Sequence, residues 1–330
     1  MPKDHDTAAA RQRYGFWVTL AGVLALCPDT LLVRLIATDA WTLMFWRGLL
    51  MGIGLLVFFA AGEGPGWLAR LLRIGWPGVA AALMFATNAI CFVLALDNTT
   101  VANTLLIVAT SPFFSALLSW IFLGERISLR TTLAILVACA GIATIFSGSL
   151  VGADHAGSLW GDLSALCTAV GMAGGFVLVR RHRRVNMVPA MALGDLIACL
   201  VALPLASPLA LDGSQFGLTL IMGLLLLPVA FGLITIGPRY IPAPEVGLMM
   251  LLETVLGPLL VWAVVGEASS PEALIGGAVV VGTLAVHALI GLRQASRAAA
   301  RAAAAPTAAP GRVARRPAEL RAEQSGQHAL

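Results

Sequence analysis

Charged residues are scarce in this chain of 330 residues. Asp, Glu, Lys and Arg together make up 12% of it, whereas 59% is hydrophobic and the mean hydropathy is +0.90. A soluble domain usually carries about twice this share of charge. The composition therefore excludes an ordinary soluble globular protein.

Lysine is almost absent, since Lys3 is the only one. A Walker A motif requires a lysine after its second glycine, and Schiff-base catalysis requires a lysine at the reaction centre. The sequence therefore excludes ATP hydrolysis through such a motif and Schiff-base chemistry within the membrane.

Cysteine and histidine are also few, with five of each. An odd number of cysteines within apolar segments argues against a disulfide framework. Among the histidines only His287 lies in an apolar segment, so no zinc site can be assembled from them. We expect no metal site, no cofactor and no catalytic residue.

Long apolar runs are abundant. Residues 74–96, 98–124, 131–153 and 213–238 contain no charge, and a helix needs roughly 20 apolar residues to cross a hydrocarbon core of ~30 Å. We therefore predict an all-α integral membrane protein. Ten transmembrane helices are expected, at about 14–35, 41–61, 74–96, 99–122, 131–149, 157–179, 187–208, 216–237, 244–265 and 273–292.

The distribution of basic residues supports this count of helices. If the N-terminus is cytoplasmic, all but two of the 21 Lys and Arg residues fall on the cytoplasmic side, as the positive-inside rule requires. The two exceptions, Arg34 and Arg47, lie at the outer end of the first pair of helices. Both termini are therefore predicted to be cytoplasmic.

Residues 97–141 and 239–283 resemble each other. A shift of 142 residues aligns Ser111-Pro112 with Glu253-Thr254, Trp120 with Trp262, and Gly124-Glu125 with Gly266-Glu267. Because each half holds five helices, an odd number, the second half must enter the membrane from the opposite side. We predict two inverted five-helix repeats, an arrangement that in transporters places the site between the halves.

This prediction divides the chain into four parts. A cytoplasmic N-terminus (1–13) precedes the first repeat (14–149), and the second repeat (157–292) precedes a basic cytoplasmic tail (293–330). The tail is rich in Ala, Arg and Pro, so we expect it to be disordered. Its arginines would either contact anionic lipid or remain solvated.

The sequence resembles bacterial EamA-type members of the drug/metabolite transporter superfamily. The matching residues are Phe45-Trp46-Arg47-Gly48, Ser111-Pro112 with Leu123-Gly124-Glu125-Arg126, and Leu251-Leu252-Glu253 with Gly266-Glu267. The chain departs from the family pattern at Thr254, where proline is common. Pro258 follows one turn later, so we expect the break in the ninth helix there. The resemblance implies alternating-access transport, usually export of small metabolites such as amino acids, in the bacterial inner (plasma) membrane.

Charged residues within the predicted helices need a partner or a function, because charge in a bilayer is costly. We place Glu253, near the middle of the ninth helix, in the substrate or ion pathway, where it would bind an ammonium group or a proton. The alternative is a carboxylate held by a neighbouring hydroxyl or a freed helix end. Asp195 has a similar depth in the seventh helix, and its alternative role is a structural pair with an arginine.

Arg47 and Asp29 map to the outer part of the membrane. Arg47 would pair with Asp29 or Asp162 to gate the outer mouth, or would hold an anionic substrate group. The alternative for Arg47 is a side chain that extends to the outer head groups.

Uncharged polar residues and proline breaks complete the predicted pathway. Asn88, Asn103 and Ser111 are candidates, with helix–helix hydrogen bonds as the alternative. Trp17 would either reach the cavity or anchor the interface. Prolines that interrupt helices often border a transporter's site, although they also serve as simple kinks; those predicted to interrupt helices here are Pro28, Pro112, Pro228 and Pro258.

The predicted function is secondary export of small organic metabolites, with amino acids or their analogues indicated by the resemblance. The alternatives are an exporter of hydrophobic cations or drugs, an intramembrane lipid-modifying enzyme, and a membrane scaffold or sensor. Expected partners are a small-molecule substrate, the lipid bilayer and protons as coupling ion. No nucleic-acid partner is expected, and the protein should be a monomer or a weak homodimer.

Overall fold

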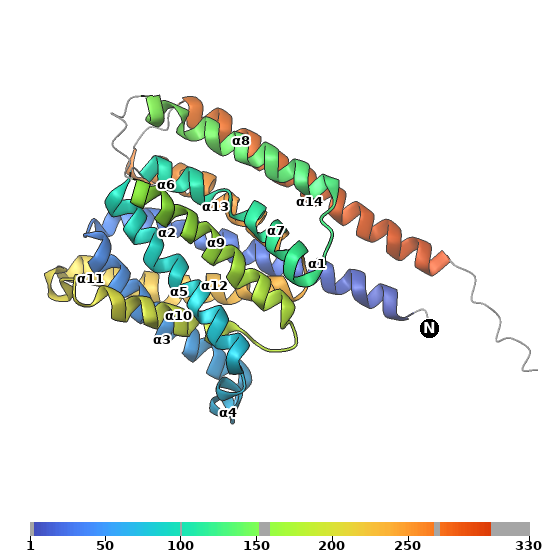
Figure 1. Ribbon diagram of the computed structural model, residues 1–330, viewed down its shortest axis with the longest axis horizontal. Coiled ribbons are helices and arrows are strands. Elements are labelled where there is room, and N and C mark those ends of the chain that lie inside the picture. The colour runs from blue at the N-terminus through green and yellow to red at the C-terminus, as the bar shows by residue number, and fades with distance from the viewer. Residues whose placement is uncertain (1–2, 100, 152–158, 267–270, 305–330) are drawn as a thin grey trace, which may run out of the picture.

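The computed structural model describes residues 3–99, 101–151, 159–266 and 271–304, and every regular element among them is a helix (Figure 1). In chain order these are α1 (Lys3–Leu26), α2 (Pro28–Ile36), α3 (Ala40–Glu63), α4 (Trp67–Leu72), α5 (Gly75–Asn98), α6 (Val101–Val108), α7 (Ser111–Leu123), α8 (Leu129–Val151), α9 (Leu159–Arg181), α10 (Val188–Ala202), η1 (Pro208–Ala210), α11 (Gly213–Leu220), η2 (Ile221–Leu226), α12 (Leu227–Ile236), η3 (Gly237–Arg239), α13 (Ala243–Val265) and α14 (Pro271–Ala304).

Several of these helices are long and apolar enough to cross a membrane. Within the described residues seven segments meet this condition: Ala10–Ile36, Ala40–Glu63, Gly75–Asn98, Thr104–Leu123, Leu159–Arg181, Gly213–Arg239 and Ala243–Val265. Three shorter apolar helices accompany them, at Leu129–Thr144, Val188–Ala202 and Leu274–Ile290. The all-helical, multi-pass architecture is confirmed, and the count of ten spans stays a prediction.

The contacts between helices repeat when the two halves of the chain are exchanged. α3 packs on α10, α7 on α13 and α8 on α14, and each pair joins helices at corresponding positions of the halves. The contact of α5 with α9 likewise corresponds to that of α1 with α12. Figure 1 shows α8 and α14 side by side along the top of the view. The packing of the helices therefore has the same internal repeat as the sequence.

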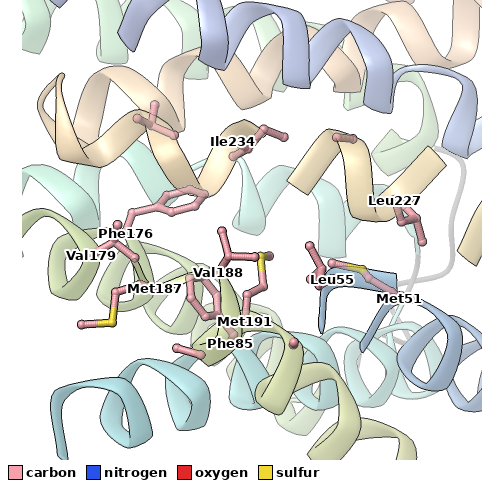
Figure 2. Close-up of a cluster of buried hydrophobic side chains, with 14 of the residues drawn as sticks. Met51, Leu55, Phe85, Phe176, Val179, Met187, Val188, Met191, Leu227 and Ile234 are labelled. Carbon is pink, nitrogen blue, oxygen red and sulfur yellow. The ribbon is translucent and has the colours of Figure 1, made fainter. Parts of the chain in front are cut away.

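The largest buried cluster of apolar side chains joins the two halves. Figure 2 shows Met51 and Leu55 of α3 and Phe85 of α5 together with Phe176 of α9 and Met191 of α10. Because lipid tails are as apolar as these side chains, close packing rather than the hydrophobic effect holds such helices together.

Glycines allow the closest helix contacts. A Cβ atom at Gly48 of α3 would lie 2.6 Å from the carbonyl oxygen of Asp195 on α10, and one at Gly171 of α9 would lie 2.9 Å from the carbonyl oxygen of Met84 on α5. Both belong to Gly-x-x-x-Gly motifs, which permit backbones to approach closely. These motifs therefore pack within one chain.

Two aspartates cap the helices that follow loops. Asp39 accepts a hydrogen bond from the backbone N–H of Thr42 at 2.9 Å and so caps α3. Asp212 forms a capping box with Gln215 at the start of α11. Hydrogen bonds from the Gln215 backbone and the Ser214 hydroxyl hold the pKa of Asp212 below its usual value.

Helix boundaries differ from the predicted domain limits at both ends of the chain. α1 already begins at Lys3, within the predicted N-terminal segment, and α14 continues to Ala304, within the predicted disordered tail. The prediction of disorder from residue 293 is therefore wrong for 293–304. This stretch consists mostly of Ala and Arg, which have high helix propensity. The remaining tail, 305–330, lies outside the described residues.

Replacement of Gly48 by Ala tests the close contact between α3 and α10. The new Cβ would overlap a backbone oxygen, so we expect a loss of about 1–3 kcal/mol in the free energy of unfolding. Gly62→Ala in the same helix is the matched control, because no atom lies within 4 Å of the position where its Cβ would stand. Thermal unfolding in detergent measures both. Equal stabilities of the two variants would contradict the predicted contact.

Candidate substrate pathway

Three of the membrane segments are interrupted or change helix type beside prolines. α1 ends at Leu26 and α2 begins at Pro28, so Asp29 lies in the first turn of a new helix. In the fourth segment α6 ends at Val108 and Pro112 follows in the first turn of α7. In the eighth, Pro228 follows the π-helical stretch η2. Such breaks free backbone polar groups at membrane depth.

The expected break of the ninth helix at Pro258 is wrong. α13 runs without interruption from Ala243 to Val265 and contains Pro258 in its interior. Membrane helices tolerate an internal proline where neighbouring helices support the backbone. Pro258 nevertheless cannot donate to the carbonyl of Thr254, the residue after Glu253.

A partly buried ion pair joins α2 and α3. Nη1 of Arg47 lies 2.6 Å from Oδ2 of Asp29, whose side chain is almost completely buried. Of the two partners predicted for Arg47, Asp29 is therefore the one observed. The second carboxylate oxygen of Asp29, Oδ1, is buried and has no hydrogen-bond partner among the described residues. Asp162 instead accepts a hydrogen bond from the Thr99 hydroxyl.

Asp195 of α10 and Glu253 of α13 belong to the same charge cluster. Arg47 interacts electrostatically with both, in addition to Asp29. Within the part of the chain that the structure describes, Oδ2 of Asp195 is buried without a hydrogen-bond partner. One guanidinium group thus pairs with one carboxylate and lies within electrostatic range of two more; we call these four residues the charge cluster (Asp29, Arg47, Asp195 and Glu253).

Close helix contacts hold the charge cluster in place. Gly48, next to Arg47, lies against the backbone oxygen of Asp195. One turn beyond Glu253, a Cβ at Gly257 would lie 2.5 Å from the Thr30 hydroxyl, beside Asp29. The first half of the chain supplies α2 and α3, and the second half supplies α10 and α13. The charge cluster therefore spans both halves.

The other predicted residues have different surroundings. Nδ2 of Asn88 donates to the carbonyl oxygen of Thr168 at 3.1 Å, which joins α5 to α9 and matches the alternative of a helix–helix hydrogen bond. Trp17 is 56% exposed and packs edge-on against Phe16. Asn103 lies on α6, but its side chain is outside the described part of the structure.

Ser111 belongs to a column of serines that the sequence analysis missed. Ser111, Ser115 and Ser119 follow one another at intervals of four residues on α7, so they share one face. All three are buried, and their hydroxyl groups have no hydrogen-bond partner within the described segments. Their spacing in an otherwise apolar helix was the signal that could have revealed them.

The serine column ends at a polar cavity of about 280 Å³. The cavity lies where α7 ends and where α8 and α13 begin, at the predicted cytoplasmic end of the bundle. Its lining residues are Ser119, Glu125, Arg126, Ile127, Ser128, Arg130, Thr131, Pro242, Pro244 and Glu245.

Two ion pairs cross this end of the bundle. Arg180 of α9 lies 3.0 Å from Glu125, and Arg130 of α8 lies 3.9 Å from Glu245 of α13. Because each pair joins segments of different halves, separation of the halves here would require both pairs to break. They therefore form a candidate gate.

No group of three His, Cys, Asp or Glu side chains in the described residues could hold a metal ion.

A comparison with known protein families identifies the family of this chain. The model of the EamA-like transporter family matches residues 14–147 and 159–288. The chain belongs to the EamA-like transporter family. It is therefore a multi-pass membrane transporter of the drug/metabolite transporter type, and its two matched segments correspond to the two repeats.

A solved structure has the same fold as this EamA-like transporter. It is described only as "Crystal structure of protein", is 21% identical, covers 86% of this chain and 98% of its own, and has a TM-score of 0.72. No curated protein matches the sequence.

Removal of Arg47 tests the charge cluster. Arg47→Met would leave three carboxylates without their cation, and we expect a loss of about 3–5 kcal/mol in the free energy of unfolding. Arg70→Met is the matched control, because Arg70 forms an ion pair of the same length, 2.6 Å to Glu63, at an exposed position. Its loss should cost at most about 1 kcal/mol. Denaturant titration in mixed micelles measures both, and similar costs would refute a buried charge cluster.

Proposed function

We propose that this EamA-like transporter exports small organic metabolites with an ammonium group, amino acids or their analogues, across the bacterial inner membrane by alternating access. The charge cluster is the single observation that carries this proposal. It combines three carboxylates with one guanidinium on helices of both halves. Movement of one half against the other would expose such a site to each side in turn.

The charge balance of the cluster points to a substrate with an ammonium group. Arg47 neutralises one carboxylate, and an uncompensated carboxylate within a bilayer is costly. A substrate ammonium near Glu253 would supply one of the two missing positive charges, and a substrate carboxylate could share Arg47. The unpartnered oxygens of Asp29 and Asp195 are available to accept hydrogen bonds in the described structure.

The serine column and its cavity provide a route for polar groups towards the cytoplasm. Ser119 lines the cavity, and Ser115 and Ser111 continue the same face of α7 deeper into the bundle. In this proposal the ion pairs of Glu125 and Glu245 close the inner end of the route. A coupling proton would bind to Glu253 or Asp195, in exchange for the substrate.

Export of hydrophobic cations is the second candidate, favoured by the excess of carboxylates in the charge cluster. The two candidates differ in their need for Arg47. An amino acid carries a carboxylate that would pair with Arg47, whereas a hydrophobic cation has no group for it. Transport of a cation would therefore depend on Glu253 and not on a guanidinium–carboxylate contact.

Solute counterflow in proteoliposomes tests the proposal. Vesicles are preloaded in parallel with neutral amino acids, organic cations or sugar nucleotides, and the uptake of the matching labelled compound is followed. We expect accumulation with the amino acid pool. Glu253→Gln should reduce the exchange rate at least tenfold, because a charge-assisted hydrogen bond contributes about 1.5–3 kcal/mol.

Glu63→Gln provides the control, since Glu63 lies at the end of α3 and pairs with Arg70 and Asn186 outside the charge cluster. This variant should exchange like the wild type. Accumulation with cations alone would replace the first candidate by the second. Unchanged exchange in Glu253→Gln would remove Glu253 from the mechanism, and no exchange with any pool would refute both candidates.

A further inference from the structure

A second cavity, separate from the charge cluster, lies between α1, α13 and α14. Its volume is about 240 Å³, and it contacts the polar cavity described above at Arg130 and Glu245. None of the four residues of the charge cluster is among the described residues that line it, which are Gln12, Arg13, Phe16, Leu20, Arg130, Ile241, Glu245, Leu248, Met249, Leu252, Val281, Leu284, Ala285, His287 and Ala288.

The lining of this cavity is amphipathic along its length. On α1, Gln12 and Arg13 precede Phe16 and Leu20, and on α13 Glu245 precedes Leu252. α14 runs in the opposite direction across the membrane in the predicted topology. Its polar residue, His287, therefore lies near the same end as Arg13 and Glu245. The polar end of the cavity is thus at the predicted cytoplasmic surface, and its apolar end reaches towards the membrane interior.

His287 indicates that a polar group enters this cavity. Both of its ring nitrogens are buried, and neither has a hydrogen-bond partner among the residues that the structure describes. An imidazole always has at least one N–H donor, and a buried donor without an acceptor is costly. An acceptor oxygen from a bound molecule at the polar end would satisfy it.

The charges at the polar end favour an anion. Two guanidinium groups, those of Arg13 and Arg130, accompany a single carboxylate, that of Glu245. The ion pair of Arg130 with Glu245 is long, 3.9 Å. Basic pockets between transmembrane helices on the cytoplasmic side bind phosphate-containing lipid head groups. Guanidinium groups are also well suited to phosphate.

The remainder of the cavity favours an acyl chain. Phe16, Leu20, Leu252 and Leu284 line it, together with Val281 of α14, which is 36% exposed. We propose that an anionic phospholipid of the inner leaflet binds here, with its phosphate at Arg13, Arg130 and His287 and one acyl chain between α1, α13 and α14.

Native mass spectrometry of the full-length protein in detergent tests this site. Phosphatidylglycerol is titrated, with phosphatidylcholine as the zwitterionic comparison and glycerol 3-phosphate as the soluble source of phosphate. We expect phosphatidylglycerol to bind more tightly than either. Arg13→Ala should weaken its binding by roughly fivefold, because one arginine near a membrane surface contributes about that factor.

Matched variants separate this cavity from the general surface. Arg11→Ala removes the same charge two residues away on α1, outside the cavity lining, and should leave binding unchanged. Leu284→Trp, which fills the cavity, should abolish tight binding, whereas Leu289→Trp on the exposed side of α14 should not. Equal effects of Arg11→Ala and Arg13→Ala, or full binding by Leu284→Trp, would overturn the proposal. Equal affinity for glycerol 3-phosphate would also overturn it.

Discussion

The ion pair between Arg47 and Asp29 is the constraint on which the rest of the structure depends. A charge at membrane depth is costly unless it has a partner. Arg47 lies 2.6 Å from Asp29 and within electrostatic range of Asp195 and Glu253. These residues require α2, α3, α10 and α13 to meet. Glycines at the two contacts, Gly48 among them, allow the backbones to approach closely enough. The packing of the two halves and the chemistry of the site therefore have the same origin.

The charge cluster also breaks the symmetry of the repeat. The helix contacts keep the same pattern when the two halves are exchanged. Glu253 in the second half, however, corresponds to Ser111 in the first. The first half thus contributes a column of neutral hydroxyl groups, and the second contributes a carboxylate. In the proposed function, an EamA-like transporter built from two related halves acquires in this way one polarised site, with a polar route on one side of it. The cavity at Arg13 and His287 adjoins the inner end of this route, since Arg130 and Glu245 line both cavities.

The sequence predicted the architecture well because hydrophobic length, basic loops and the internal repeat are local properties of the chain. It also singled out Arg47 and Glu253 as candidates, since a charge in an apolar run is conspicuous, and their role stays a prediction. It could not decide between Asp29 and Asp162 as the partner of Arg47, because that choice depends on helix packing. The break predicted at Pro258 is absent, because neighbouring helices support a continuous α13 around this residue. The helical extension to Ala304 arises from alanine propensity, which a disorder argument based on low hydrophobicity does not weigh.

A double-mutant cycle between Arg47 and Glu253 tests most directly whether the two halves share one charge cluster. The free energy of unfolding is measured for the wild type, Arg47→Met, Glu253→Gln and the double variant in the same detergent. We predict a coupling energy of about 0.5–3 kcal/mol, as found for residues within one network, with the loss of Arg47 less costly once Glu253 is neutral. Additivity to within about 0.3–0.5 kcal/mol would show that these charges do not interact and would contradict the proposed site.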